Sequence, residues 1–178
     1  MLLNQLSIGN NPPYDLNVVI EVPMGGAPIK YEVDKPSNAL MVDRFMYTAM
    51  AYPCNYGFVP HTLSDDGDPV DVLYHCPYPL APNCVASARP IGVLLMEDEA
   101  GLDEKIFAVP SRSLTDEYDK IQSVDGISEA IRNKISHFFE HYKDLENKKW
   151  AKVIGWRDEV VARQIITESI ARAQNVAA

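Results

Sequence analysis

The sequence predicts an α+β domain built on a closed or nearly closed β-barrel, for three reasons. Short β-branched or alternating segments dominate the chain as far as Pro110, and helical patterns follow it. Strands that come first, with helices segregated after them, are typical of this architecture. The chain has 178 residues, 47% of them hydrophobic, which suffices for a domain with its own core. We therefore expect one domain spanning residues 1–178.

The strand segments follow one another with few interruptions. Residues 16–22 are rich in β-branched side chains, which favour strands. Residues 29–33 alternate, so that Lys30 and Glu32 share a polar face, and Glu21 could line a cleft beside them. Further extended segments are expected at residues 40–45, 52–60, 71–76, 84–96, 106–109 and 148–156.

Two amphipathic helices are expected in the second half of the chain. Residues 127–145 repeat apolar side chains at helical spacing. The stripe consists of Ile131, Ile135, Phe138, Tyr142 and Leu145. Asp158 is a suitable N-cap for a final helix, because its side chain can accept hydrogen bonds from the first-turn amides. The stripe of that helix consists of Ala162, Ile166, Ile170 and Ala173.

The strongest chemical signal is the segment Asp-Asp-Gly-Asp-Pro-Val-Asp at residues 65–71, which we call the acidic turn. Gly67 tolerates a positive φ angle and Pro69 excludes a helix, so a tight turn leading into a strand is expected. Clustered carboxylates repel one another in water, and a hard divalent cation such as Mg²⁺ compensates that repulsion. The alternative is an ordinary solvated surface turn.

A second acidic segment, residues 97–105, is expected to form a hairpin loop. It is either a solvated hairpin tip or, if it meets the acidic turn at one mouth of the barrel, part of a site for several metal ions. Groups that could bind an anion beside such a site are Lys30, Arg44, Tyr52, Tyr56, Lys105, Tyr142 and Lys143. Metal ions and basic groups together suit a small, highly charged phosphate.

A competing motif is His-Phe-Phe-Glu-His at residues 137–141, which matches the HxxEH pattern of inverted zinc peptidases. A zinc peptidase needs a third ligand, and only 37 residues follow His141. The favoured alternative places His137 and His141 on a helix flank, available for packing or a subunit contact.

Composition excludes several classes of partner. A net charge of −9 disfavours nucleic acids, whose binding relies on neutralising phosphates. The number of cysteines is odd, namely Cys54, Cys76 and Cys84, which indicates free thiols in a reducing compartment. No signal peptide and no membrane-spanning apolar run is recognisable. We therefore expect a cytoplasmic protein with no membrane or nucleic-acid partner.

Ordered motifs along nearly the whole chain closely resemble those of the family I soluble inorganic pyrophosphatases of the short bacterial type. They are IKYEVD (29–34), VDRF (42–45), YPCNYG (52–57), DGDPVDVL (66–73), RPIGVL (89–94), DEAGLDEK (98–105) and HFFEHYKDL (137–145). The D-G-D-P-x-D motif is the most specific of them, and the HxxEH pattern is part of the family's own helix.

The resemblance implies a five-stranded closed, OB-like barrel with two main helices packed on it. It implies Mg²⁺-dependent hydrolysis of pyrophosphate to two orthophosphates by direct attack of a metal-activated water, without a covalent intermediate and with three to four Mg²⁺ ions per site during turnover. A non-catalytic OB-like module that binds divalent ions or oligonucleotides is the remaining alternative.

The resemblance also assigns roles to individual residues. Asp68 would be the general base. The metal ligands would be Asp66, Asp71, Asp98, Asp103 and Glu21. The substrate-binding residues would be Lys30, Arg44, Tyr56, Lys105, Tyr142 and Lys143, with Glu32, Tyr52 and Glu99 in support.

Two further expectations concern a departure from the family pattern and the assembly. Leu95 stands where relatives often carry lysine, which would alter the charge of the cleft without touching an assigned role. A homo-oligomer, specifically a hexamer, is implied, and His137 and His141 would lie near a subunit interface.

Overall fold

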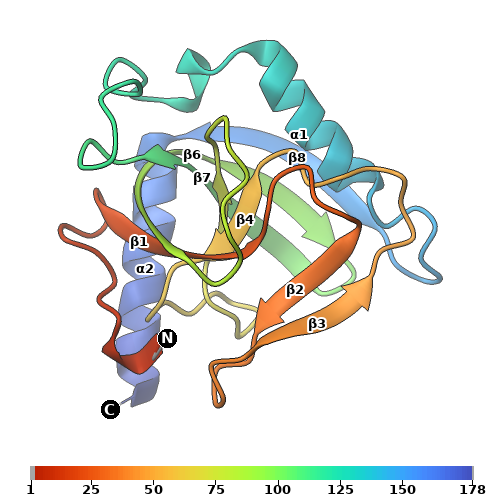
Figure 1. Cartoon of the computed structure of the whole chain (residues 1–178), viewed down its shortest axis with the longest axis horizontal. Coiled ribbons are helices and arrows are strands. Elements are labelled where there is room, and N and C mark those ends of the chain that lie inside the picture. Colours follow the sequence, from red (N-terminus) through yellow and green to blue (C-terminus); the bar gives the residue numbers. More distant parts are fainter. Residues whose placement is uncertain (1–2, 178) are drawn as a thin grey trace.

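The computed structural model describes residues 3–177 and contains a ring of five strands. The strands are hydrogen-bonded in the order β1 (Leu16–Val22), β4 (Asn55–Phe58), β5 (Asp71–Tyr74), β7 (Gly101–Pro110) and β6 (Val85–Asp98). Because β6 pairs again with β1, the ring closes (Figure 1). Only β5 and β7 pair in parallel within this ring. The predicted five-stranded closed barrel is therefore confirmed.

Three more strands complete the described sheets. β8 (Ala151–Asp158) pairs with β6 outside the ring, and β2 (Ile29–Val33) with β3 (Leu40–Phe45) forms a separate hairpin. Every strand segment that the sequence predicts is present, although some bounds differ: β5 ends earlier, at Tyr74, and β6 runs further, to Asp98.

Two helices cover different surfaces of the barrel, α1 (Glu129–His141) and α2 (Glu159–Ala177) (Figure 1). The strands between them alternate between two cores. On β7, Phe107 packs in the cluster that contains Phe139 of α1, whereas Ile106 packs in the cluster that contains Ile166 of α2. Short 3₁₀ helices lie at η1 (Leu3–Gln5) and η2 (Val124–Gly126). No helix among the described residues is long and apolar enough to cross a membrane.

The predicted hairpin at residues 97–105 is present, but its loop is shorter than predicted. β6 continues to Asp98 and β7 already begins at Gly101, so that only Glu99 and Ala100 form the tip. The ladder pairs Met96 with Asp103, which places charged residues on a regular strand. So many charged residues in a short segment are typical of a loop. Here, however, one face of the hairpin borders a polar cleft, so a strand can carry them.

The predicted helix at residues 127–145 is shorter than expected. Ser128 caps α1, its hydroxyl accepting a hydrogen bond from the Ile131 amide, and the helix ends at His141. Leu145 lies beyond the helix and is 74% exposed, so it does not belong to the apolar stripe. The N-cap predicted for the last helix is confirmed, because Asp158 accepts hydrogen bonds from the amides of Val160 and Val161.

Candidate active site

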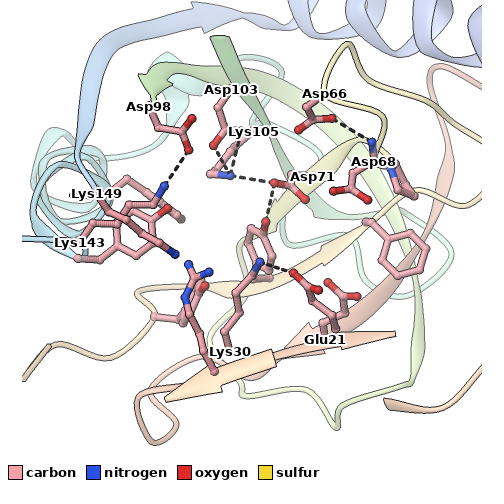
Figure 2. Close-up of a pocket in the computed structure, with 18 of the residues that line it drawn as sticks. Glu21, Lys30, Asp66, Asp68, Asp71, Asp98, Asp103, Lys105, Lys143 and Lys149 are labelled. Atoms are coloured by element: carbon pink, nitrogen blue, oxygen red, sulfur yellow. Dashed lines mark hydrogen bonds and ion pairs between the residues drawn. The ribbon is translucent and has the colours of Figure 1, made fainter. Parts of the chain in front are cut away.

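A polar cleft of about 250 Å³ opens beside the barrel, and it gathers residues that are distant in the sequence (Figure 2). Eight carboxylates and six basic side chains line it. All fifteen of the predicted site residues are among the lining residues: Glu21, Lys30, Glu32, Arg44, Tyr52, Tyr56, Asp66, Asp68, Asp71, Asp98, Glu99, Asp103, Lys105, Tyr142 and Lys143. The structure thus brings the two acidic segments to one place, as the sequence predicts.

The acidic turn is shaped by its own backbone. Gly67 adopts φ of +92°, which favours glycine, and the Asp68 amide donates to the Asp66 carboxylate at 3.0 Å. The Ser64 amide donates to the Asp68 carbonyl at 2.7 Å. At the base, the Thr62 hydroxyl accepts from the Val70 amide at 3.0 Å. These bonds fix the backbone of the turn and the Asp66 carboxylate, whereas the side chain of Asp68 is 74% exposed.

Lys105 links the acidic turn to the β6–β7 hairpin. Its ammonium lies 2.8 Å from Asp71 Oδ2 and 3.0 Å from Asp103 Oδ2, and the residue is only 3% exposed. Burial lowers the pKa of Lys105, but the two carboxylates outweigh burial and hold that pKa well above its usual value. The Tyr56 hydroxyl also donates a hydrogen bond to Asp71. Burial is the main cause that raises the pKa of this phenol, so it stays protonated.

Lys143 joins the end of α1 to the tip of the same hairpin. Its ammonium lies 2.8 Å from Asp98 Oδ2 and 3.3 Å from Glu99 Oε1. Burial opposes ionisation of Asp98, but the bonds from Lys143 and the Ala100 amide prevail and lower the pKa of Asp98. Figure 2 shows this pair on one side of the cleft, with Asp66 and Asp68 on the other.

Two carboxylates of the cleft have a raised pKa. Glu21 on β1 is 5% exposed and accepts a hydrogen bond from the Val33 amide at 2.7 Å. Burial, together with the charge of Asp71, raises the pKa of Glu21 to about 7. Burial likewise raises the pKa of Asp103. A positive charge bound nearby would offset both shifts.

The donor chemistry of the cleft fits a hard divalent cation. Asp66, Asp71 and Asp103 also line a neighbouring hollow of about 20 Å³, together with Asp65 and Glu104. Carboxylate oxygens are the ligands that Mg²⁺ prefers. Within residues 3–177, however, no three His, Cys, Asp or Glu side chains already form a compact ligand group. The ammonium of Lys105 lies between Asp71 and Asp103 instead.

The remaining predicted residues lie around the entrance and the floor of the cleft. Lys30 bonds to Glu32 on the same strand, and the Arg44 guanidinium lies 3.7 Å from Glu146. The Tyr52 ring packs against the Tyr56 ring, with centroids 5.4 Å apart. The pKa of Tyr142 is raised, mainly by burial, so its hydroxyl keeps its proton and can donate a hydrogen bond.

Two lysines of the cleft were not predicted. Lys35 lies in the turn between β2 and β3, with its ammonium 3.6 Å from Asp68 Oδ1. Lys149 follows α1 and lies 3.2 Å from Glu146 Oε2. Neither lysine lies in a helix or strand of the structure, so only its positive charge could have indicated that it lines the cleft.

The expectation that Leu95 alters the charge of the cleft is wrong. Leu95 packs against the core cluster on the α2 side, whereas its neighbours Leu94 and Met96 belong to the cluster on the α1 side. Successive side chains of a strand point to opposite faces, so a residue at this position of β6 faces away from the cleft.

The two histidines of the HxxEH motif lie outside the cleft. Their rings are 4.7 Å apart on α1, and His141 Nδ1 lies 2.9 Å from Asp144 Oδ2. His137 lines a separate apolar groove with Met24 and Met50. In the described part of the chain no third metal ligand completes the pair, so the zinc-peptidase alternative has no structural support.

The comparisons with known proteins agree with this geometry. The family model described as inorganic pyrophosphatase matches residues 18–174. Inorganic pyrophosphatases of Brucella melitensis and Agrobacterium fabrum are 60% and 59% identical, and the alignments cover 98% and 97% of this chain and 99% and 97% of theirs. Solved structures from Coxiella burnetii (51% identity, covering 94% of this chain and 99% of that one) and Thermus thermophilus (43%, covering 98% and 99%), both inorganic pyrophosphatases, superpose with TM-scores of 0.91.

Proposed function

The chain belongs to the inorganic pyrophosphatase family, and from this membership we infer that it hydrolyses pyrophosphate to two orthophosphates, in the cleft described above and as a single domain of residues 1–178. The observation that carries the site is the convergence of eight carboxylates and six basic groups on one cleft. Such a surface suits a small polyanion that arrives with metal ions. An oligonucleotide-binding module would instead need a predominantly basic or aromatic face.

The proposed phosphate-binding groups are Lys30, Arg44, Tyr56, Lys105, Tyr142 and Lys143. Lys105 and Lys143 support this role most clearly, because both are nearly buried. Burial lowers the pKa of each lysine, but the neighbouring groups raise it by more than burial lowers it. Both ammoniums therefore remain charged across the physiological pH range. Each is now paired with carboxylates, and a bound phosphate could share those same donors.

The proposed cation is Mg²⁺, with three to four ions per site during turnover and with Asp66, Asp71, Asp98, Asp103 and Glu21 as ligands. When bound, Mg²⁺ would neutralise phosphate charge and lower the pKa of a water in the cleft. The raised pKa values of Glu21 and Asp103 support this assignment, because a nearby cation would offset the burial and the like charge that raise them.

Asp68 is proposed as the general base that accepts a proton from the attacking water, without a covalent intermediate. Its side chain is exposed and lines the cleft. Its backbone amide donates a hydrogen bond to the Asp66 carboxylate, which couples the proposed base to a proposed metal ligand. Three residues are proposed to support the site. Glu32 holds Lys30, Glu99 holds Lys143, and Tyr52 packs under Tyr56.

The direct test is phosphate release from pyrophosphate by the purified protein. We expect rapid release with Mg²⁺, none after chelation with EDTA, and full activity in the presence of a zinc-selective chelator. Casein should not be cleaved under the same conditions. Phosphate release that continued unchanged in EDTA would contradict the metal dependence.

We further propose a cytoplasmic homo-hexamer in which His137 and His141 lie near a subunit interface. All three cysteines are free thiols, which suits a reducing compartment. Both histidines are exposed, and His137 borders an apolar groove of about 530 Å³. Protonated imidazoles from several subunits would repel one another, so assembly should weaken as pH falls from 8 to 5.

Sedimentation velocity across that range tests the assembly. Asp144 already offers His141 a carboxylate, so protonated His141 has a partner within its own subunit. His137→Gln should therefore reduce the pH dependence more than His141→Gln. Identical pH behaviour in the double variant and the wild type would remove both residues from the interface.

A further inference from the structure

We propose that Arg172, near the end of α2, is a positioning residue for the hydrolytic reaction, because it holds the acidic turn in the orientation that presents Asp66 and Asp68 to the cleft. The proposal rests on the function inferred above. None of the motifs that identify the family includes Arg172, and its side chain does not line the cleft.

The guanidinium of Arg172 makes two bonds to the chain just before the turn. One terminal nitrogen, Nη2, lies 2.8 Å from Asp65 Oδ1, and the other, Nη1, donates to the carbonyl oxygen of Leu63. The Leu63 amide in turn donates to the carbonyl of Ser169 at 3.1 Å. Ser169 and Arg172 lie three residues apart, hence on one face of α2. One turn of this helix therefore holds both the backbone and a side chain of residues 63–65.

The bonds continue from there to the proposed catalytic groups. The Ser64 amide donates to the Asp68 carbonyl at 2.7 Å, and the Asp68 amide donates to Asp66 Oδ1 at 3.0 Å. A displacement of residues 63–65 is thus transmitted to the general base and to a metal ligand. The side chains of Asp65 and Asp68 are 80% and 74% exposed, so packing contributes little to their placement.

A single exposed ion pair is worth little, and the Arg172–Asp65 contact alone would not carry this role. Arg172 does more than form one ion pair, because its planar guanidinium bonds through two nitrogens to Leu63 and to Asp65. Two such bonds restrict rotation as well as translation of the segment. The pair also gives Asp65, a carboxylate next to Asp66 in the same hollow, a partner that does not line the cleft.

The test compares Arg172→Gln and Arg172→Lys with Arg163→Gln, a matched charge removal on the same helix. Arg163 lies over the Tyr14 ring, away from the turn. We expect kcat at saturating Mg²⁺ to fall about 10- to 100-fold in Arg172→Gln, since small displacements of reacting groups have effects of this size. KM for pyrophosphate should change less than about threefold, because Lys30, Arg44, Lys105 and Lys143 lie on other elements. Arg172→Lys should recover part of kcat, and Arg163→Gln should retain the wild-type value.

Hydrogen exchange of the metal-free proteins provides a readout that needs no activity. The amides of Ser64 and Asp68 should exchange at least about tenfold faster in Arg172→Gln, while the amides of β6 and β7 stay protected. Asp65→Asn should produce a smaller change in exchange, because the bond from Arg172 to Leu63 survives.

Each outcome decides the proposal. If kcat and turn exchange in Arg172→Gln stay within twofold of wild type, Arg172 does not position the turn. Equal losses in Arg163→Gln would mean that the helix acts only through overall stability, which also overturns the proposal. If the wild type releases no phosphate, the proposed function fails, and the exchange data still decide whether Arg172 holds the turn.

Discussion

The acidic turn and the β6–β7 hairpin supply carboxylates to the same cleft, but they hold them in opposite ways. In the turn, backbone hydrogen bonds orient Asp68, whose side chain is 74% exposed. In the hairpin, Asp103 has a side-chain exposure of 19%, and its charge is compensated by Lys105, at 4%. An exposed carboxylate of the turn therefore lowers the stability of the folded state little, whereas a buried carboxylate of the hairpin requires a positively charged partner. Substitutions in the two regions should differ in the same way.

The largest effect is expected at Asp71, which connects the two regions. It begins β5, pairs with Lys105 across the parallel ladder, and accepts bonds from Lys105 and Tyr56. Asp71→Ala should lower phosphate release by about 10³-fold or more, because it removes a proposed metal ligand and a partner of two proposed substrate-binding groups. The matched control is Asp116→Ala, an exposed carboxylate that does not line the cleft. Near-normal activity of the Asp71 variant at saturating Mg²⁺ would disprove the assignment.

The next effect is on stability and concerns Lys105. Lys105→Met should lower the free energy of unfolding of metal-free protein by about 3 kcal/mol, because Asp71 and Asp103 then lose their buried counter-charge. Added Mg²⁺ should restore much of that loss, since a cation can replace the ammonium. Urea denaturation with and without Mg²⁺ measures both values. A variant that is as stable as wild type without Mg²⁺ would remove the distinction between hairpin and turn.

Asp68→Asn tests the turn side of the comparison. It should lower kcat about 10²-fold, the size expected for loss of a general base, while Mg²⁺ affinity and the free energy of unfolding stay nearly unchanged. Activity assays, calorimetric Mg²⁺ titration and urea denaturation separate these quantities. Loss of Mg²⁺ affinity with normal kcat at high Mg²⁺ would identify Asp68 as a ligand instead.

The smallest effect is a pH dependence from Glu21, a buried carboxylate on a strand. Its folded-state pKa of about 7 lies above the ordinary value of 4.5, so between these pH values the folded state keeps a proton that the unfolded state has lost. The free energy of unfolding should therefore fall as pH rises from 4.5 to 7, by about 1 kcal/mol per pH unit. Glu21→Gln should remove the Glu21 contribution to this slope in metal-free protein, and Asp68→Asn should leave it intact. The reverse pattern would show that exposed carboxylates control the pH dependence.

The sequence predicts the turn better than the hairpin, because residue type indicates the turn but does not indicate the strands of the hairpin. Gly67 and Pro69 define the turn locally, and the alternation around Lys30 and Glu32 is also local. β6 and β7 form a hairpin with a two-residue tip, but the charged residues at 97–105 hide its strands, so neither the strand character of Asp103 nor the orientation of Leu95 could be derived from residue type. The bonds from Arg172 to residues 63–65 join segments more than 100 residues apart, and no local pattern indicates them.

The central claim is that both regions serve one reaction centre, and a double-mutant cycle tests it most directly. Asp66 comes from the turn and Asp103 from the hairpin, and the two line one hollow. Phosphate release would be measured for Asp66→Asn, Asp103→Asn and the double variant across Mg²⁺ concentrations. If the two carboxylates share an ion, the double variant should be scarcely slower than the slower single variant. Losses that multiply across the cycle would show that the two residues act independently and would contradict a shared centre.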